Sequence, residues 1–277
     1  FAADGVAHYR DLVEASARSG HEQFAVEYAR GRLAILDRDP DTIVRVFGKG
    51  LPNQYAVLAL VEALDEAGLS RLAVQYAERG LAMARTHHAS VLVDRLVLDA
   101  VERGDLDGAL NLRRTDYRQE PTSARLAAYA SAARAAGTWD RERPDAEAHM
   151  ATHRPHELLG VLLTHDRNDE AWEFATANRT AAEGHWERLC ARRAVTAPAD
   201  TIPVYQALID RTLETTGRGS YIAAARLLTR LREVCVRAGQ VDHFRTFVAA
   251  TVEANRRRPT CIEEFRRAGL IDRAGAV

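Results

Sequence analysis

Three histidines of this chain have the spacing of metal ligands on a helix. His149, His153 and His156 follow one another at steps of four and three residues, so a continuous helix would place them on one face. Zinc requires three or four ligands that converge at about 2.0–2.3 Å. However, Pro155 disfavours helical backbone at the residue before it, and no cysteine or carboxylate lies within the cluster. We therefore expect exposed or capping histidines, with a metal site as the alternative.

The run Arg256, Arg257 and Arg258 has the chemistry to bind phosphate, because guanidinium forks match phosphate oxygens. Three arginines also suit the C-terminus of a helix, where they offset its partial negative charge. The chain has 38 basic and 39 acidic residues and lacks the wide basic patch of nucleic-acid-binding proteins. We expect the capping role, with nucleic-acid binding as the alternative.

Known catalytic motifs are absent from the sequence. There is no Gly-x-Ser-x-Gly elbow and no His-Glu-x-x-His pair. Gly48-Lys49-Gly50, which holds the only lysine of the chain, lacks the upstream glycine and the following Ser or Thr of a phosphate-binding loop. We therefore expect a protein without a catalytic site and without a cofactor.

The cysteines and tryptophans are typical of packing residues. Cys190, Cys235 and Cys261 are too few and too scattered for a disulfide framework, so we expect reduced thiols and a cytoplasmic protein. A buried thiol packs as a small hydrophobe. Tryptophans pack readily between helices, which is the role we expect for Trp139, Trp172 and Trp186.

Helical periodicity runs through the chain, whereas strand signals are nearly absent. From Tyr221 to Ala238, apolar residues recur at steps of three and four, with charged residues on the opposite face. Helix start and stop signals predict about 14 helices, including one opened by Pro198 and one capped by Thr260 with Glu263. The longest apolar run, residues 56–61, is far shorter than a membrane span, so we expect no membrane partner.

The breaks between helices repeat one pattern. Gly20, Gly68 and Gly104 are each followed five residues later by alanine, and Asp166 takes the same place before Ala171. Glycine adopts the left-handed conformation that ends a helix, and a small residue lets the next helix pack closely. The Gly and Ala positions in residues 63–85 and 98–121 resemble those of tetratricopeptide repeats. We therefore predict an all-α superhelix, or solenoid, of degenerate tetratricopeptide-like hairpins.

The stretch from Thr138 to Pro155, which contains Pro144, is the most irregular part of the sequence. We place a junction there, between N-terminal degenerate repeats in residues 1–150 and a C-terminal helical region in residues 151–277. A single continuous solenoid is the alternative. Because the chain begins with Phe1 and without a signal pattern, we expect it to be part of a longer protein.

Roughly the last hundred residues contain an ordered series of segments, 169–175, 186–190, 198–200, 204–205, 221–232 and 244–258. This order is similar to that of the C-terminal helical region of bacterial SWIM zinc-finger proteins. Such proteins carry a Cys-x-Cys and a later Cys-x-His, and the resemblance implies binding to protein or nucleic acid. This chain contains neither motif, so no zinc ligand is carried over to it.

The sequence therefore predicts a non-catalytic helical scaffold that binds a protein partner and belongs to a larger protein similar to the SWIM family. One alternative is a nucleic-acid-binding region that acts with a zinc finger outside this chain. Another is a metal-dependent enzyme that uses the histidines of residues 149–156.

Overall fold

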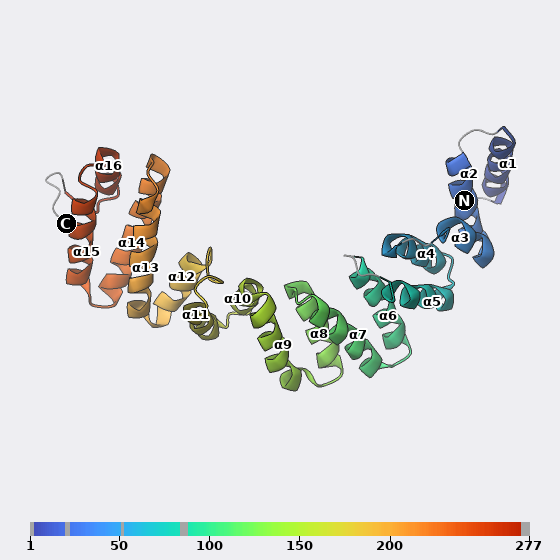
Figure 1. Ribbon diagram of the computed structural model, residues 1–277, viewed down its shortest axis with the longest axis horizontal. Helices are drawn as coiled ribbons and strands as arrows, with labels where there is room; N and C mark the ends of the chain where they lie inside the picture. The colour runs from blue at the N-terminus through green and yellow to red at the C-terminus, as the bar shows by residue number, and fades with distance from the viewer. Residues whose placement is uncertain (1–2, 20–22, 51–52, 84–87, 273–277) are drawn as a thin grey trace. The chain divides into compact units, whose positions relative to one another are not determined.

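The fold is all-α, as the periodicity predicts. The computed structural model describes residues 3–19, 23–50, 53–83 and 88–272, and these residues form 16 helices and no strand (Figure 1). The described residues thus form more helices than the about 14 predicted from helix start and stop signals. Within these ranges, no helix combines the length and the apolar composition needed to cross a bilayer. The chain divides into two compact units, residues 1–150 and 151–277.

The first unit is built from α1 to α9, the last of which extends past residue 150. Its helices are α1 (Ala3–Ser19), α2 (Gln23–Asp37), α3 (Pro40–Phe47), α4 (Gln54–Glu66), α5 (Ser70–Leu81), α6 (Ala89–Glu102), α7 (Leu106–Gln119), α8 (Ser123–Ala135) and α9 (Trp139–His153). From α1 to α8 each helix packs against its neighbours in sequence, and α4 also contacts α2 and α6. Contacts between near neighbours along the chain are the packing of a helical solenoid.

The second unit continues the same kind of packing. Its helices are α10 (Pro155–Thr164), α11 (Asn168–Ala177), α12 (Trp186–Thr196), α13 (Pro198–Glu214), α14 (Arg218–Arg237), α15 (Val241–Ala254) and α16 (Pro259–Arg267). The long α14 is central to this unit, because α13, α15 and α16 all pack against it. Leu228 and Leu231 of α14 are fully buried, as the apolar stripe of its sequence predicts.

One type of turn recurs between paired helices. Among the described residues, six such turns place a single residue at φ between 55° and 76°, and the following amide donates to the carbonyl five residues before it, at 2.8–3.0 Å. The six residues are Arg38, Gly68, Gly104, Gly137, Asp166 and Gly239. The left-handed position predicted for Gly68, Gly104 and Asp166 is confirmed, whereas Gly20 lies outside the described residues.

The residue five positions after each turn faces the preceding helix, as the alanine pattern predicts. Ala73 and Ala171 are fully buried, and Ala109 is 2% exposed. A methyl group at this position lets the two helices of a hairpin approach closely. In these three hairpins the turn and the small side chain occur together, whereas Ile43 and Phe244 take the same buried position after Arg38 and Gly239.

Two local expectations are wrong. The helix that contains Thr260 begins at Pro259 with Arg258 as its N-cap, and no side chain caps it, because proline already occupies the first helical position. The stretch around Pro144 is regular helix rather than irregular chain. Ala146 and Met150 of α9 are buried, so packing outweighs the hydrogen bond that Pro144 removes.

A carboxylate replaces the small residue in the hairpin of α8 and α9. Glu142, five residues after Gly137, has a side chain that is 11% exposed. It accepts hydrogen bonds from Arg114 at 2.8 and 3.0 Å, from the Thr138 hydroxyl at 2.8 Å and from the Tyr129 hydroxyl. The pKa of Glu142 is lowered to about 2. The hydrogen bonds from Arg114 are the largest cause, and burial acts in the opposite direction. The network therefore holds three helices together only while Glu142 is ionised.

We predict that Glu142→Gln lowers the free energy of unfolding by roughly 2–3 kcal/mol at pH 7, because the amide cannot accept all of these hydrogen bonds. The folded pKa is depressed below the ordinary 4.5, so the contribution of Glu142 is full above that pH and is lost as the pH falls toward 2. Urea unfolding at several pH values measures both effects.

The exposed Glu78 of α5 provides the control, since Glu78→Gln should change stability by less than about 0.5 kcal/mol. A stability difference between wild type and Glu142→Gln that is the same at pH 7 and pH 3 would contradict the assigned linkage.

Candidate functional site

Exposed aromatic side chains gather in the first 55 residues of the chain. Phe24 is 85% exposed, Tyr55 64%, Tyr28 52% and Tyr9 45%, and among the described residues no other Phe, Tyr or Trp is exposed to this degree. Aromatic side chains are enriched where proteins bind each other, because they bury a large area with few rotatable bonds. Three of these four side chains surround one groove.

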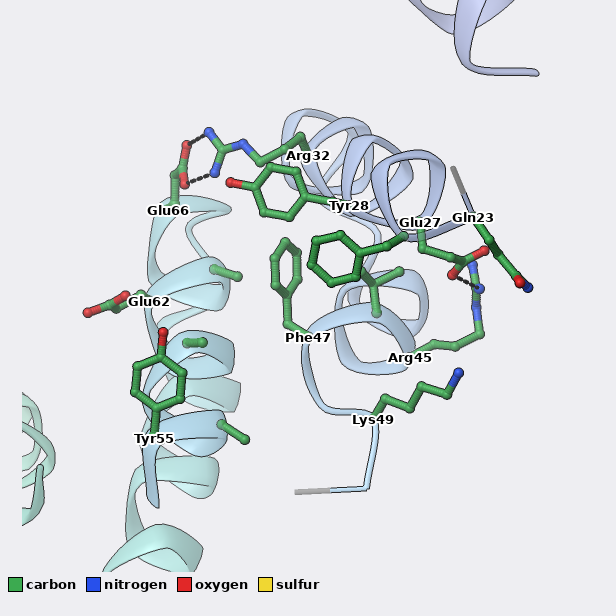
Figure 2. A pocket seen from close by; sticks show the side chains of 15 residues that line it. Gln23, Glu27, Tyr28, Arg32, Arg45, Phe47, Lys49, Tyr55, Glu62 and Glu66 are labelled. Atoms are coloured by element: carbon green, nitrogen blue, oxygen red, sulfur yellow. Dashed lines mark hydrogen bonds and ion pairs between the residues drawn. The ribbon is translucent and has the colours of Figure 1, made fainter. Parts of the chain in front are cut away.

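The groove has a volume of about 1110 Å³ and lies among α2, α3 and α4 (Figure 2). Ala56, Ala59 and Ala63 form one wall, since steps of three and four place them on the same face of α4. Figure 2 shows Phe47 and Tyr28 beside each other between α2 and α4. The other lining residues are Gln23, Phe24, Glu27, Arg32, Arg45, Val46, Lys49, Tyr55, Glu62 and Glu66.

The aromatic wall depends on a glycine of α2. A Cβ at Gly31 would lie 2.7 Å from the Phe47 ring and 2.8 Å from Val46, so any side chain there would displace the end of α3. Phe47 instead packs edge-on against Tyr28, with ring centroids 6.1 Å apart. Gly31 thus sets the position of Phe47 in the groove.

Ion pairs frame the groove at its rim. Arg32 of α2 forms a bidentate pair with Glu66 of α4, both contacts at 2.6 Å, and Arg45 of α3 lies 3.4 Å from Glu27 of α2. The hydrogen bonds from Arg32 lower the pKa of Glu66 below its ordinary value. These side chains stay partly exposed, so each pair contributes little stability but restrains its two side chains.

Lys49 is the cation of this groove that remains available. It is the only lysine of the chain, and no carboxylate within the described residues pairs with it. In Figure 2 it lies at the end of the groove away from the Arg32–Glu66 pair. Besides the ion pairs, the groove offers apolar contact and the ammonium group of Lys49.

The structure does not bring the three histidines together as one helical face. His149 lies in α9, where its Nε2 is 3.0 Å from the Arg118 carbonyl oxygen and its ring packs on Tyr117. His153 is the last residue of α9, and Arg154 breaks the helix with φ −143° before α10 carries His156. Across the described residues, no group of three His, Cys, Asp or Glu side chains has the arrangement of a metal site.

The three arginines of residues 256–258 lie in the turn between α15 and α16. Arg258 donates to the Leu213 carbonyl oxygen at 2.8 Å and to the Asn255 side chain at 3.0 Å. Leu213 is in the last turn of α13, whose carbonyls lack helical partners, so Arg258 caps a helix C-terminus. Arg256 pairs with Glu253, and Arg257 is exposed.

The cysteines and tryptophans pack as the sequence predicts. All three thiols are reduced and buried, and burial raises the pKa of Cys190 to about 12. Trp172 of α11 meets Trp186 of α12 edge-on, with ring centroids 6.1 Å apart, and Trp139 of α9 meets Tyr129 of α8 at 5.8 Å. These residues join consecutive helices.

No protein-family model matches the chain, and no curated protein is similar to it in sequence.

Sequence reasoning missed the groove. Phe24 and Tyr28 are four residues apart in α2, a spacing that predicts a buried stripe, and only the structure shows them exposed. The single lysine of the chain, Lys49, is the one sequence signal that points to this groove.

We predict that Arg258→Ala lowers the free energy of unfolding by roughly 1–2 kcal/mol, because it leaves the Leu213 carbonyl without its donor. The exposed Arg257 gives the matched control, and Arg257→Ala should be neutral. Chemical denaturation measures both.

Neither substitution should alter retention on a DNA or RNA column. A clear loss of retention with Arg257→Ala would assign nucleic-acid contact to this turn instead.

Proposed function

We propose that the chain is a non-catalytic helical scaffold that binds a segment of a partner protein in the groove among α2, α3 and α4. The observation that carries this proposal is the convergence of three exposed aromatic side chains, Phe24, Tyr28 and Tyr55, on one groove. Buried aromatic residues are among those that contribute most to binding energy at protein interfaces.

The shape of the groove supports a peptide segment as the occupant. The alanine face of α4 leaves room for apolar side chains of a ligand, and the aromatic wall opposite can pack against them. The volume of about 1110 Å³ suits several residues of a peptide and exceeds what most small metabolites fill.

The charges of the groove support a segment with one acidic group. Arg32 and Arg45 are engaged by Glu66 and Glu27, which leaves Lys49 to attract a carboxylate. Glu62, the other carboxylate of the lining, points away from Phe47 and Lys49 in Figure 2. An acidic side chain or a terminal carboxylate of the partner would pair with Lys49 while the apolar residues cover the aromatic wall. The expected ligand is therefore an apolar segment with an acidic residue at one end.

The wider setting forms part of the same proposal. The order of segments after residue 169 supports membership of a longer protein similar to the SWIM zinc-finger family. Three reduced and buried thiols support a place in the cytoplasm. Sequencing the gene upstream tests the family assignment, which fails if no Cys-x-Cys and Cys-x-His pair is encoded there.

We predict that a library of displayed 12-residue peptides, selected on the full chain, yields apolar sequences that contain Asp or Glu or end in a free carboxylate. Tyr55→Ala should weaken the best peptide at least about tenfold, because it removes an aromatic contact surface. Isothermal titration calorimetry measures the change.

Tyr9→Ala is the matched control, since Tyr9 is a similarly exposed tyrosine that does not line the groove, and it should change affinity by less than about twofold. Lys49→Glu should shift the selected peptides from acidic to basic. Peptides that bind Tyr55→Ala as tightly as wild type would overturn the proposal.

A further inference from the structure

A second pocket, of about 370 Å³, lies within residues 151–277 between α12, α13 and α14. Its cationic side chains are Arg188 of α12 and Arg230 and Arg237 of α14, and Tyr205 of α13 also lines it. Its remaining lining residues are Glu187, Ala191, Glu233 and Val234.

The hydroxyl of Tyr205 is a hydrogen-bonding group without a protein partner. Tyr205 is only 4% exposed, yet its hydroxyl bonds to none of the described residues. It is not sealed in the core either, because within the described residues Arg95 Nη1 is the one inaccessible side-chain polar atom that lacks a partner. Buried tyrosine hydroxyls usually have a partner, so this one is available to a molecule in the pocket.

Arg188 and Arg237 are fixed by hydrogen bonds to backbone carbonyl oxygens rather than by ion pairs with carboxylates. Arg237 donates to the Ala194 carbonyl oxygen at 3.1 Å, and Arg188 donates to the Leu163 carbonyl oxygen at 3.3 Å. Each contact uses one of the five N–H groups of a guanidinium. Both side chains therefore keep donors and positive charge for a ligand.

The carboxylates of the pocket cancel only part of this charge, because three arginines and two glutamates line it and a net positive charge remains. Glu233 pairs with Arg230 at 3.0 Å, and Glu187 lies 3.9 Å from Arg226, which is outside the pocket. Arg188 and Arg237 remain as the arginines without a carboxylate partner in the pocket that Tyr205 also lines.

We propose that this pocket binds the phosphate group of a small molecule. The guanidinium groups of Arg188 and Arg237 would donate to phosphate oxygens, and Tyr205 would donate its hydroxyl to another. A volume of about 370 Å³ holds a phosphate group with a few further atoms. This site is independent of the peptide groove, since the two share no residue.

Isothermal titration calorimetry of the full chain with inorganic phosphate and with glycerol 3-phosphate, at constant ionic strength, tests the proposal. Tyr205→Phe should weaken binding about three- to tenfold, because it removes one hydrogen bond and keeps the ring. Arg237→Gln should weaken it at least about tenfold. Tighter binding of glycerol 3-phosphate assigns the site to a phosphate ester, and equal binding assigns it to the free ion.

Arg257→Gln is the control, because Arg257 is an exposed arginine outside the pocket with no contact to its lining residues, and it should leave affinity unchanged. Binding should also perturb the near-ultraviolet tyrosine spectrum of wild type, and Tyr205→Phe should lack this change. Equal affinity of wild type and Tyr205→Phe for both compounds, or no binding at millimolar concentrations, would overturn the proposal.

Discussion

The structure depends on one backbone constraint, the left-handed residue that ends the first helix of a hairpin. Five or six residues further on, the next helix must already lie against the one before it, so the residue at the fifth position is forced into the contact. Where that residue is Ala73, Ala109 or Ala171, the backbones approach closely. Where it is Glu142, the contact admits a carboxylate only because Arg114 and two hydroxyl groups supply its hydrogen bonds.

The groove follows from how this constraint operates at the first described hairpin. Arg38 makes the turn between α2 and α3, and α3 is only 8 residues long. A helix this short does not cover the facing sides of α2 and α4, and the alanines of α4 do not fill the space either. Phe47, at the end of α3, occupies part of that space because Gly31 gives it room. The aromatic side chains of α2 are left exposed at the edge of what remains.

The sequence predicts the parts of this fold that depend on local chemistry. Glycine predicts a left-handed turn, and the alanine spacing allowed the same turn to be predicted at Asp166. Nothing local predicts it at Arg38, because the left-handed conformation costs a non-glycine residue roughly 1–2 kcal/mol. The groove could not be predicted from the sequence either, because periodicity shows which residues share a helix face but not whether a neighbouring helix covers that face.

The arginines show how one residue type serves two purposes. Arg32 and Arg114 pair with carboxylates, which neutralises them and leaves them to hold helices together. Arg188, Arg237 and Arg258 donate instead to carbonyls in the last turn of a helix, where the contact fixes the side chain but leaves its charge in place. An arginine that caps a helix can therefore also attract an anion. Whether it does so depends on its neighbours, and beside Arg237 the neighbour is a tyrosine hydroxyl that no described residue uses.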